Sequence, residues 1–278
     1  MSTVLVVALI LSGVLQFVYS EDNTTATPTD YCQKDLCHFL KKHIGCRNKG
    51  ELNKQCPADA YLVNLTGLHD LILDEHNALR NVLAAGKAPK LPQPDRMATL
   101  RWHAELEDLA TLNVKQCALQ YDPCHNTPEF RNSGQNLAII NITLLQGEGN
   151  HTDECLIRES IGGWWNQSIN ITREQLQRFP KGKLGDSIRN FAIMARDNNT
   201  FVGCAALRFD KPAGHPQFLL ACNYASNYVP DWPIYREKSI GCQSGSDLKY
   251  PSLCKAGEQY QELPLEESAT VRSGFWRL

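Results

Sequence analysis

The stretch that decides the fold is residues 201–224, which read FVGCAALRFDKPAGHPQFLLACNY. Apolar residues fill both ends, and a segment with proline and glycine separates them, which is the pattern of a β-hairpin. If Cys204 faces Cys222 across an antiparallel pair, Phe209 faces Gln217. The sequence therefore predicts two antiparallel strands in this register, with everything between Phe209 and Gln217 left as the turn.

Three segments upstream of the hairpin carry apolar residues at helical spacing. They are residues 68–85, 102–117 and 155–165. Gly86 stops the first, and a proline-rich loop over residues 88–95 separates it from the second. The sequence therefore predicts three helices that precede the hairpin.

The beginning of the chain is typical of a secretory signal peptide. Its apolar run ends at Val18 and is too short to cross a bilayer comfortably, and Ser20 with the acids after it suits a cleavage site. A buried N-terminal helix is the alternative interpretation. We expect residues 1–20 to be removed and residues 21–30, which are polar and rich in threonine, to form a flexible leader. No later stretch is apolar for long enough to span a membrane.

Eleven cysteines behind such a segment indicate an oxidising compartment and a disulfide framework. The formal net charge is −2, and the lysines of residues 34–54 alternate with acids. A solvated face is therefore favoured over a polyanion site, and we expect no nucleic-acid partner. The candidate N-glycosylation sites, which also favour secretion, are Asn23, Asn64, Asn141, Asn150, Asn166, Asn170 and Asn198.

Five short motifs occur along the chain in a fixed order. They are Glu75-His76-Asn77-Ala78-Leu79-Arg80, Leu100-Arg101-Trp102 leading to Glu105-Leu106, Gly134-Gln135-Asn136-Leu137-Ala138, Val202-Gly203-Cys204 and Cys222-Asn223-Tyr224. With these motifs the chain resembles the CAP superfamily of cysteine-rich secretory proteins, antigen 5 and plant pathogenesis-related proteins, and most of all the insect antigen 5 branch.

The resemblance implies an α+β fold, a three-layer α-β-α sandwich. The CAP domain would cover residues 67–230. A disulfide-rich segment, residues 31–66, would precede it, and a C-terminal extension with one short disulfide loop, residues 231–278, would follow.

The resemblance also implies a disulfide pattern, which the cysteine count alone does not assign. The implied pairs are Cys32–Cys46, Cys37–Cys124, Cys56–Cys117 and Cys204–Cys222, and the two that remain near the C-terminus, Cys242–Cys254, would close a short loop. Cys155 is left unpaired. It is either a buried free thiol on a helix or the site of an intermolecular bridge that would make a dimer.

Many CAP domains have a cleft with two histidines and two glutamates, which can hold a divalent metal and has prompted suggestions of peptidase activity. By the motif match, these positions are Tyr121, Gln135, Gln167 and Asn190. None offers an imidazole or a carboxylate, and amides neither exchange protons near neutral pH nor bind zinc-type ions well. We therefore expect no metal, no cofactor and no acid–base catalysis here. His125, which follows Cys124, is expected to point elsewhere.

Other candidate groups have simpler interpretations. His69 and His76 lie on the first predicted helix, and two unrelated histidines are favoured over a shared ligand site. No motif places a histidine to activate Ser187. The aromatic residues Trp164-Trp165 and Phe191 either line an apolar groove or belong to the core, and the core is favoured.

The resemblance implies a secreted, non-enzymatic binding protein of a glandular fluid such as venom, saliva or a reproductive secretion. Its partner would be an extracellular protein or a small apolar ligand such as a lipid. The alternative is a secreted peptidase-like or metal-dependent CAP enzyme. A channel-blocking toxin would need a second cysteine-rich module, and only Cys242 and Cys254 follow the CAP motifs. A glycan on Asn166, next to Gln167, would partly cover the cleft.

Overall fold

The computed structural model describes residues 29–37, 41–145, 151–211, 214–237 and 240–260. The expected signal peptide, most of the leader, the C-terminal tail and the sequons Asn23 and Asn150 lie outside these residues. The elements in chain order are β1 (Tyr61–Leu62), η1 (Thr66–Leu68), α1 (His69–Ala84), β2 (Arg101–Trp102), α2 (Ala104–Val114), β3 (Gly134–Asn141), η2 (Ile142–Leu144), α3 (Asp153–Asn166), η3 (Gln167–Asn170), α4 (Arg173–Gln177), α5 (Lys183–Asp186), α6 (Arg189–Met194), β4 (Phe201–Lys211) and β5 (His215–Tyr224).

The β4–β5 hairpin is the centre of the sheet, and its register is the predicted one. Cys204 pairs with Cys222 and Phe209 with Gln217. The sheet continues with β3 antiparallel to β5 and with β1 antiparallel to β4, and β2 pairs in parallel with β4. The hairpin therefore joins all the other strands.

The predicted turn was too long, because β4 and β5 stay paired as far as Lys211 and His215. Pro216, which we placed in the turn, pairs with Asp210 inside the ladder. Cys204 and Cys222 are 4.1 Å apart at Cα, which marks a pair without mutual hydrogen bonds, and Pro216 has the same parity along β5. Its missing N–H therefore costs no hydrogen bond to β4, and the proline is tolerated.

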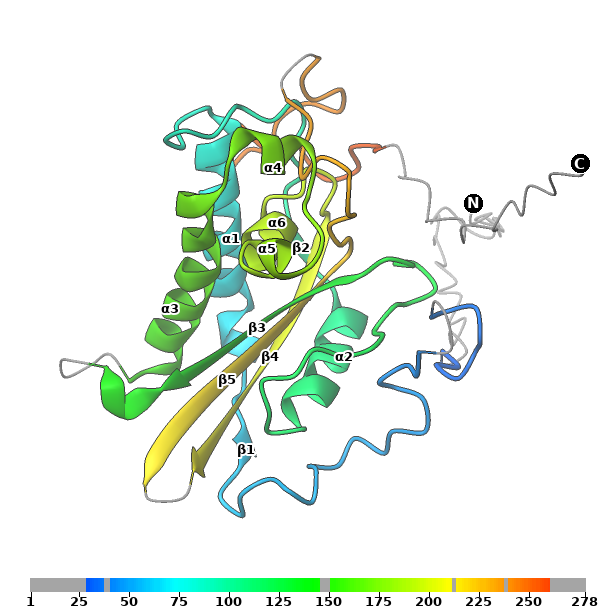
Figure 1. Ribbon diagram of the computed structural model, residues 1–278, viewed down its shortest axis with the longest axis vertical. Helices are drawn as coiled ribbons and strands as arrows, with labels where there is room; N and C mark the ends of the chain where they lie inside the picture. The colour runs from blue at the N-terminus through cyan, green and yellow to red at the C-terminus, as the bar shows by residue number, and fades with distance from the viewer. Residues whose placement is uncertain (1–28, 38–40, 146–150, 212–213, 238–239, 261–278) are drawn as a thin grey trace, which may run out of the picture.

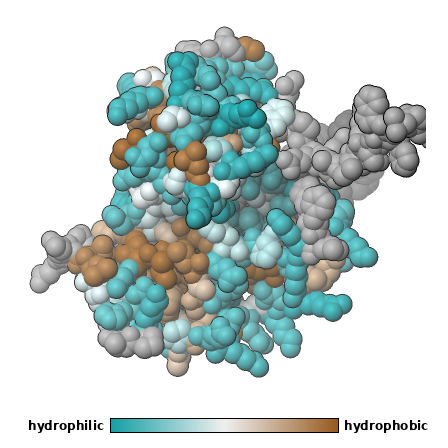
Figure 2. All heavy atoms as spheres, viewed as in Figure 1, coloured by the Kyte–Doolittle hydropathy of each residue, from teal (hydrophilic) through white to brown (hydrophobic). Residues whose placement is uncertain are grey.

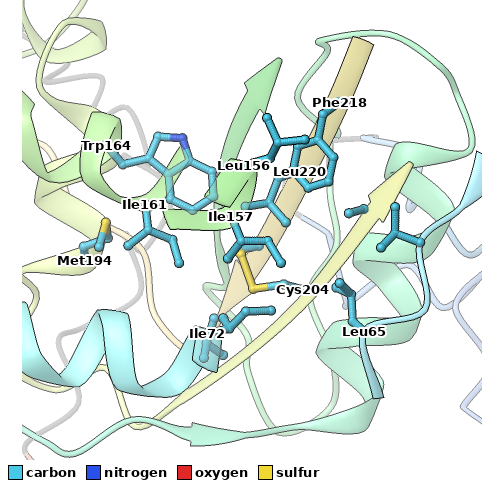
Figure 3. Close-up of a cluster of buried hydrophobic side chains, with 14 of the residues drawn as sticks. Leu65, Ile72, Leu156, Ile157, Ile161, Trp164, Met194, Cys204, Phe218 and Leu220 are labelled. Carbon is cyan, nitrogen blue, oxygen red and sulfur yellow. A yellow bond between two sulfur atoms is a disulfide. The ribbon is translucent and has the colours of Figure 1, made fainter. Parts of the chain in front are cut away.

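Helices cover both faces of the sheet. In Figure 1, α1, α3 and α6 lie on one side and α2 lies on the other, so the fold is the three-layer α-β-α sandwich that the sequence implied. Successive β4 residues alternate between the two cores: Cys204 packs with α1 and α3, and Ala205 packs with α2. Figure 3 shows the first of these cores, in which Ile72 of α1 and Ile157 of α3 surround the Cys204 sulfur.

Two of the predicted helices agree closely with α1 and α3, whereas α2 is shorter than expected. It begins at Ala104 because Trp102 pairs with Val202 in the sheet. It ends at Val114, and three residues later Cys117 has a φ of 53°, which no α-helix continues through.

Gly203 allows α2 to approach the sheet closely. A Cβ at this position would lie 2.2 Å from the Glu107 nitrogen and 2.5 Å from the His103 oxygen. Both are backbone atoms, which no side-chain rotation can move away. The first turn of α2 is therefore fixed against β4 at a distance that only glycine permits.

The structure contains five disulfides, and the bonded pairs are those that the family resemblance implies: Cys32–Cys46, Cys37–Cys124, Cys56–Cys117, Cys204–Cys222 and Cys242–Cys254. Each should stabilise the fold by about 2–4 kcal/mol, chiefly by restricting the unfolded chain. Cys155 is a free thiol, half-buried on α3 rather than fully buried as the simpler alternative had it.

The residues of the first motif have structural roles. His76 is buried, and its Nδ1–H donates to the Ile72 carbonyl at 2.8 Å, so its Nε2 accepts from the Tyr224 hydroxyl at 2.7 Å. Burial lowers the pKa of His76 to about 4, which keeps it neutral at pH 7. Arg80 is also buried and donates to main-chain oxygens, including those of Ala98 and Met194. This motif therefore joins α1 to the sheet and to the segment after α6.

The C-terminal loop closed by Cys242–Cys254 packs against α1. The Ser252 N–H donates to Asn81 Oδ1 at 2.9 Å, and the Cys254 N–H donates to the Met97 oxygen at 2.8 Å. Across the described ranges, no helix is both long enough and apolar enough to span a membrane.

Candidate functional site

The structure brings the four predicted cleft residues together from separate elements. Tyr121 lies in the loop after α2, Gln135 on β3, Gln167 on η3 and Asn190 on α6. We call these four residues the amide cluster. The Tyr121 hydroxyl donates to Asn190 Oδ1 at 3.2 Å, and the Asn190 N–H donates to Gln167 Oε1 at 2.9 Å.

Gln135 bonds to Asp122, the chain neighbour of Tyr121, whose carboxylate the sequence analysis did not single out. Its Oε1 accepts from the Asp122 N–H at 3.0 Å, and its Nε2 donates to Asp122 Oδ2 at 2.6 Å and to Asn223 Oδ1 at 2.9 Å. Gln135 is buried, with 2% of its surface exposed. Both ends of this amide are therefore occupied by bonds within the protein.

Asp122 is an ionisable group at the centre of this arrangement. Its side chain is fully buried, and its Oδ1 accepts from Asn113 at 2.7 Å and from Gln116 at 3.2 Å. Burial raises the pKa of Asp122 from 3.8 to about 6, and the amide donors, Gln135 first, oppose that rise. The signal in the sequence was an acid next to Tyr121, but only the three-dimensional path of the loop shows that its side chain turns inward.

His125, which was expected to point elsewhere than the cleft, lies beside Asp122, and among the described residues neither of its ring nitrogens has a hydrogen-bond partner. His125 Nδ1 lies 3.8 Å from Asp122 Oδ2, within a buried environment. Burial lowers the pKa of His125 to about 4, so the imidazole is neutral near pH 7. The direction of a side chain after a disulfide cysteine is set by tertiary packing, which the sequence alone did not reveal.

A positive charge lies against the amide cluster. The Arg189 guanidinium carbon is 3.5 Å from the centre of the Tyr121 ring and 5.8 Å from that of Tyr228, which is cation–π geometry. Burial raises the pKa of Tyr121, and Arg189 opposes that rise. Tyr121 is therefore a neutral phenol at physiological pH.

The donor set does not suit a family-type metal. Amide and phenol oxygens are weak ligands for a zinc-type ion, and those of the amide cluster already take part in hydrogen bonds within the protein. Arg189 would also repel a divalent cation. Within the described residues, no group of three or more His, Cys, Asp or Glu side chains is arranged to hold a metal ion.

The other candidate residues lie apart from the amide cluster. His69 and His76 have different partners, since His69 stacks on Trp102 at 3.9 Å whereas His76 bonds to Tyr224. The Ser187 hydroxyl donates to the Leu184 carbonyl at 2.8 Å within its own turn. These groups therefore form no joint site.

The aromatic residues singled out by the sequence belong to the core, as favoured. Trp164 and Phe191 are buried, and Trp165 packs edge-on against Phe191 with 5.1 Å between ring centres. The Trp164 indole N–H donates to the Leu137 carbonyl at 2.9 Å. These rings fix α3 and α6 to the sheet.

The five sequons in the described residues differ in exposure. Asn64, Asn166 and Asn170 are exposed, whereas Asn141 and Asn198 are half-buried. Asn166 is the last residue of α3, immediately before Gln167 of the amide cluster. A glycan there would begin next to the cluster.

Comparison with known proteins gives a consistent result. Residues 73–224 match the family model described as CAP, the cysteine-rich secretory protein family. The antigen 5 like allergen Cul n 1 of Culicoides nubeculosus is 38% identical over 189 residues, which cover 65% of this chain and 84% of that protein. Venom allergen-1 of Aedes aegypti is 30% identical over 233 residues, which cover 83% and 89%.

A solved structure, that of NaASP2 with Zn²⁺, superposes with a TM-score of 0.53 at 20% identity. The match covers 72% of this chain and 99% of that one. At this level of identity the likeness concerns the fold alone.

Proposed function

Because this chain belongs to the CAP family of cysteine-rich secretory proteins, we propose that it is a secreted, non-enzymatic binding protein of a glandular fluid. The fluid is a venom, a saliva or a reproductive secretion, and residues 1–20 are its signal peptide. The names of the relatives, an antigen 5 like allergen and a venom allergen, support this setting. The five disulfides support an oxidising compartment.

The observation that carries the proposal is the internal bonding of the amide cluster. At the positions of the family's two histidines and two glutamates, this chain has Tyr121, Gln135, Gln167 and Asn190. Their side-chain oxygens bond to one another or to main-chain N–H groups, and the Gln135 amide nitrogen bonds to Asp122 and Asn223. A substrate or metal would have to break these bonds before it could use the same atoms.

Zinc binding of the family type is disfavoured for the same reason. NaASP2, which has the same fold, was solved with Zn²⁺. In the present chain the corresponding positions lack imidazole and carboxylate ligands, and Arg189 brings a positive charge to Tyr121. A divalent ion would therefore lose its usual ligands and meet electrostatic repulsion.

The pair of Asp122 and His125 is the observation that favours the alternative, a peptidase-like enzyme. A carboxylate with a pKa of about 6 beside an imidazole at 3.8 Å has the components of an acid–base pair. However, the Asp122 side chain has no exposed surface, and three amide side chains bond to it. A base has to reach the proton that it abstracts, so this burial argues for a structural role.

The surface supports a protein partner more than a lipid. In Figure 2, apolar side chains gather over the end of β3 and η2, where Leu144 is 76% exposed and Ile140 and Leu145 are half-buried. β3 is also an edge strand of the described sheet. Exposed apolar side chains at the end of an edge strand are typical of protein contact surfaces. By contrast, Trp164 and Phe191, which could have lined a lipid groove, are buried in the core.

Crosslinking and mass spectrometry of the protein taken from its native fluid test the proposal. We expect a crosslinked partner that contacts residues near Leu144, no stoichiometric metal and no turnover of peptide substrates. Lipid extraction of the same sample separates the two kinds of ligand. Peptide hydrolysis that is abolished by Gln135→Leu and by Asn190→Leu, with the fold retained, would overturn the proposal.

A further inference from the structure

The outer edge of β4 changes partner along its length. β1 pairs with Leu207 and Arg208, and β2 pairs with Phe201 and Val202, so neither strand runs beside residues 203–206. A groove of about 310 Å³ lies at this interruption. That is the lower end of the range for small-molecule sites and equals roughly ten water molecules at about 30 Å³ each.

The groove lies between two backbone bonds on the outer edge of β4. The Val202 oxygen accepts from the His103 N–H at 3.0 Å, and the Ala206 oxygen accepts from the Val63 N–H at 2.9 Å. Alternate strand residues present their N–H and C=O to the same edge, so those of Cys204 face the groove between these two bonds. Cys204 is itself buried, with 0% of its surface exposed, so a ligand in the groove does not reach these groups. The groove therefore offers a ligand its side chains rather than its backbone groups.

The remaining walls have an apolar side and an acidic side. Leu62, Val63 and Leu65 come from the segment that leaves β1, and Glu107 and Thr111 come from α2. Glu107 and Thr111 are four residues apart in one helix, so they face the same way. A ligand in this groove would meet hydrocarbon on one side and a carboxylate with a hydroxyl on the other.

The Glu107 carboxylate is held in position and can still accept further hydrogen bonds. The Trp102 indole N–H donates to its Oε2 at 2.8 Å, and His69 Nε2 lies 3.3 Å from its Oε1. Each carboxylate oxygen has a second lone pair, so the group can still accept bonds from a ligand. Its side chain is 29% exposed, which leaves it accessible.

The charge around Glu107 is negative. Glu105 and Asp108 lie on the same helix end, and Glu107 is followed directly by Asp108. Burial, and then the charges of Glu107 and Glu105, raise the pKa of Asp108, which shows that these carboxylates share one field. His69 is the basic side chain paired with Glu107. A cation entering the groove is therefore attracted, whereas an anion is repelled.

We propose that this groove, between the end of β1 and α2, binds a small organic cation, namely a primary amine on a compact apolar body. The ammonium group bonds to Glu107 and Thr111, and the body lies against Leu62, Val63 and Leu65. The groove is separate from the amide cluster, so this inference does not depend on the proposed function of the whole protein.

Isothermal titration calorimetry at low ionic strength tests the inference with two probes of matched shape, phenethylamine and 2-phenylethanol. We expect phenethylamine to bind with a Kd of about 0.1–1 mM, and 2-phenylethanol to bind at least about tenfold more weakly. This comparison uses the unaltered protein, so it needs no variant to fold. No binding of phenethylamine at several millimolar, or equal binding of both probes, would overturn the proposal.

Two variants then locate the site. Glu107→Gln keeps the shape of the side chain and should weaken phenethylamine binding at least about tenfold. Asp108→Asn removes a neighbouring charge that does not line the groove, and should weaken binding less than about threefold at the same salt concentration. Equal losses in the two variants would place the amine elsewhere on the acidic surface and would contradict the site. Thermal unfolding of each variant confirms that the fold is retained.

Discussion

The amide cluster and the groove at the β4 edge differ in whether their polar groups are satisfied by hydrogen bonds within the protein. In the amide cluster, Gln135 bonds to Asp122 and to Asn223, and its own surface is almost fully buried. At the groove, Glu107 keeps free lone pairs, and its side chain is partly exposed. The first region uses its hydrogen bonds to hold the protein together, whereas the second leaves some for a ligand.

The comparison distinguishes polar residues that stabilise the fold from polar residues that can bind a ligand. Tyr121, Gln135 and Asn190 attract interest because the motif match assigns them to family cleft positions, yet their contacts are those of a structural network. Glu107 belongs to no family cleft, yet it lies in a groove with a fixed carboxylate. A position in a family motif therefore says less about chemistry than the count of unsatisfied donors and acceptors does.

The largest effect on stability is expected at Gly203, which lets α2 approach β4 beside the groove. Gly203→Ala puts a Cβ against the backbone of α2 at 2.2 Å, so α2 must move. We expect the free energy of unfolding in urea to fall by about 3–5 kcal/mol. Gly163→Ala is the matched control, because nothing lies within 4 Å of its Cβ, and it should be neutral or slightly stabilising. A Gly203→Ala protein as stable as the wild type would contradict the close approach of α2.

A smaller effect should come from breaking the amide cluster. Gln135→Leu removes the bonds to the Asp122 N–H, to Asp122 Oδ2 and to Asn223, which leaves a buried carboxylate short of donors. We expect a loss of about 2–3 kcal/mol in urea unfolding, with phenethylamine binding unchanged. Gln167→Leu, at a half-buried position, should cost less. If Gln135→Leu instead abolishes amine binding in a folded protein, the two regions are not independent.

The smallest effect is a pH dependence in which buried groups oppose one another. Burial lowers the pKa of both His125 and His76 from 6.5 to about 4, so stability is full above pH 6.5 and falls as the pH drops toward 4. Burial raises the pKa of Asp122 from 3.8 to about 6, so this group destabilises the ionised fold, and the penalty is relieved over the same fall in pH. Asp122 therefore partly offsets the histidines.

Asp122→Asn should expose that offset. Without the carboxyl, the loss of stability between pH 6.5 and pH 4.5 becomes steeper by about 1–2 kcal/mol, measured by urea unfolding at both pH values. Asp70→Asn, at an exposed position on α1, serves as the control and should leave the slope unchanged. A shallower slope in Asp122→Asn would reverse the sign and contradict the raised pKa of Asp122.

The features that the sequence predicts correctly are those marked by a strong pattern in the sequence itself. The register of β4 and β5 follows from the pairing of Cys204 with Cys222, and α1 and α3 follow from apolar residues at helical spacing. The four residues of the amide cluster were identified by their positions in family motifs. The structure then added what the motifs lack, namely the bonds between these residues.

The remaining features depend on tertiary structure that no short pattern encodes. β1 and β2 have two residues each, so their existence depends on β4 rather than on their own sequence. The groove exists because β4 exchanges one of these partners for the other, and neither strand was predicted. Asp122 was missed because the loop after Cys117, a residue with positive φ, decides which side chains turn inward.

Zinc titration of the wild-type protein, followed by dialysis and metal analysis, tests most directly whether the amide cluster has lost the family's ion site. The comparison protein carries Tyr121→His, Gln135→Glu, Gln167→Glu and Asn190→His, which restores the family's ligand types. We expect no stoichiometric zinc on the wild type and at least about tenfold tighter binding by the restored protein. One zinc ion retained per wild-type chain, and lost on Asn190→Leu, would contradict this account.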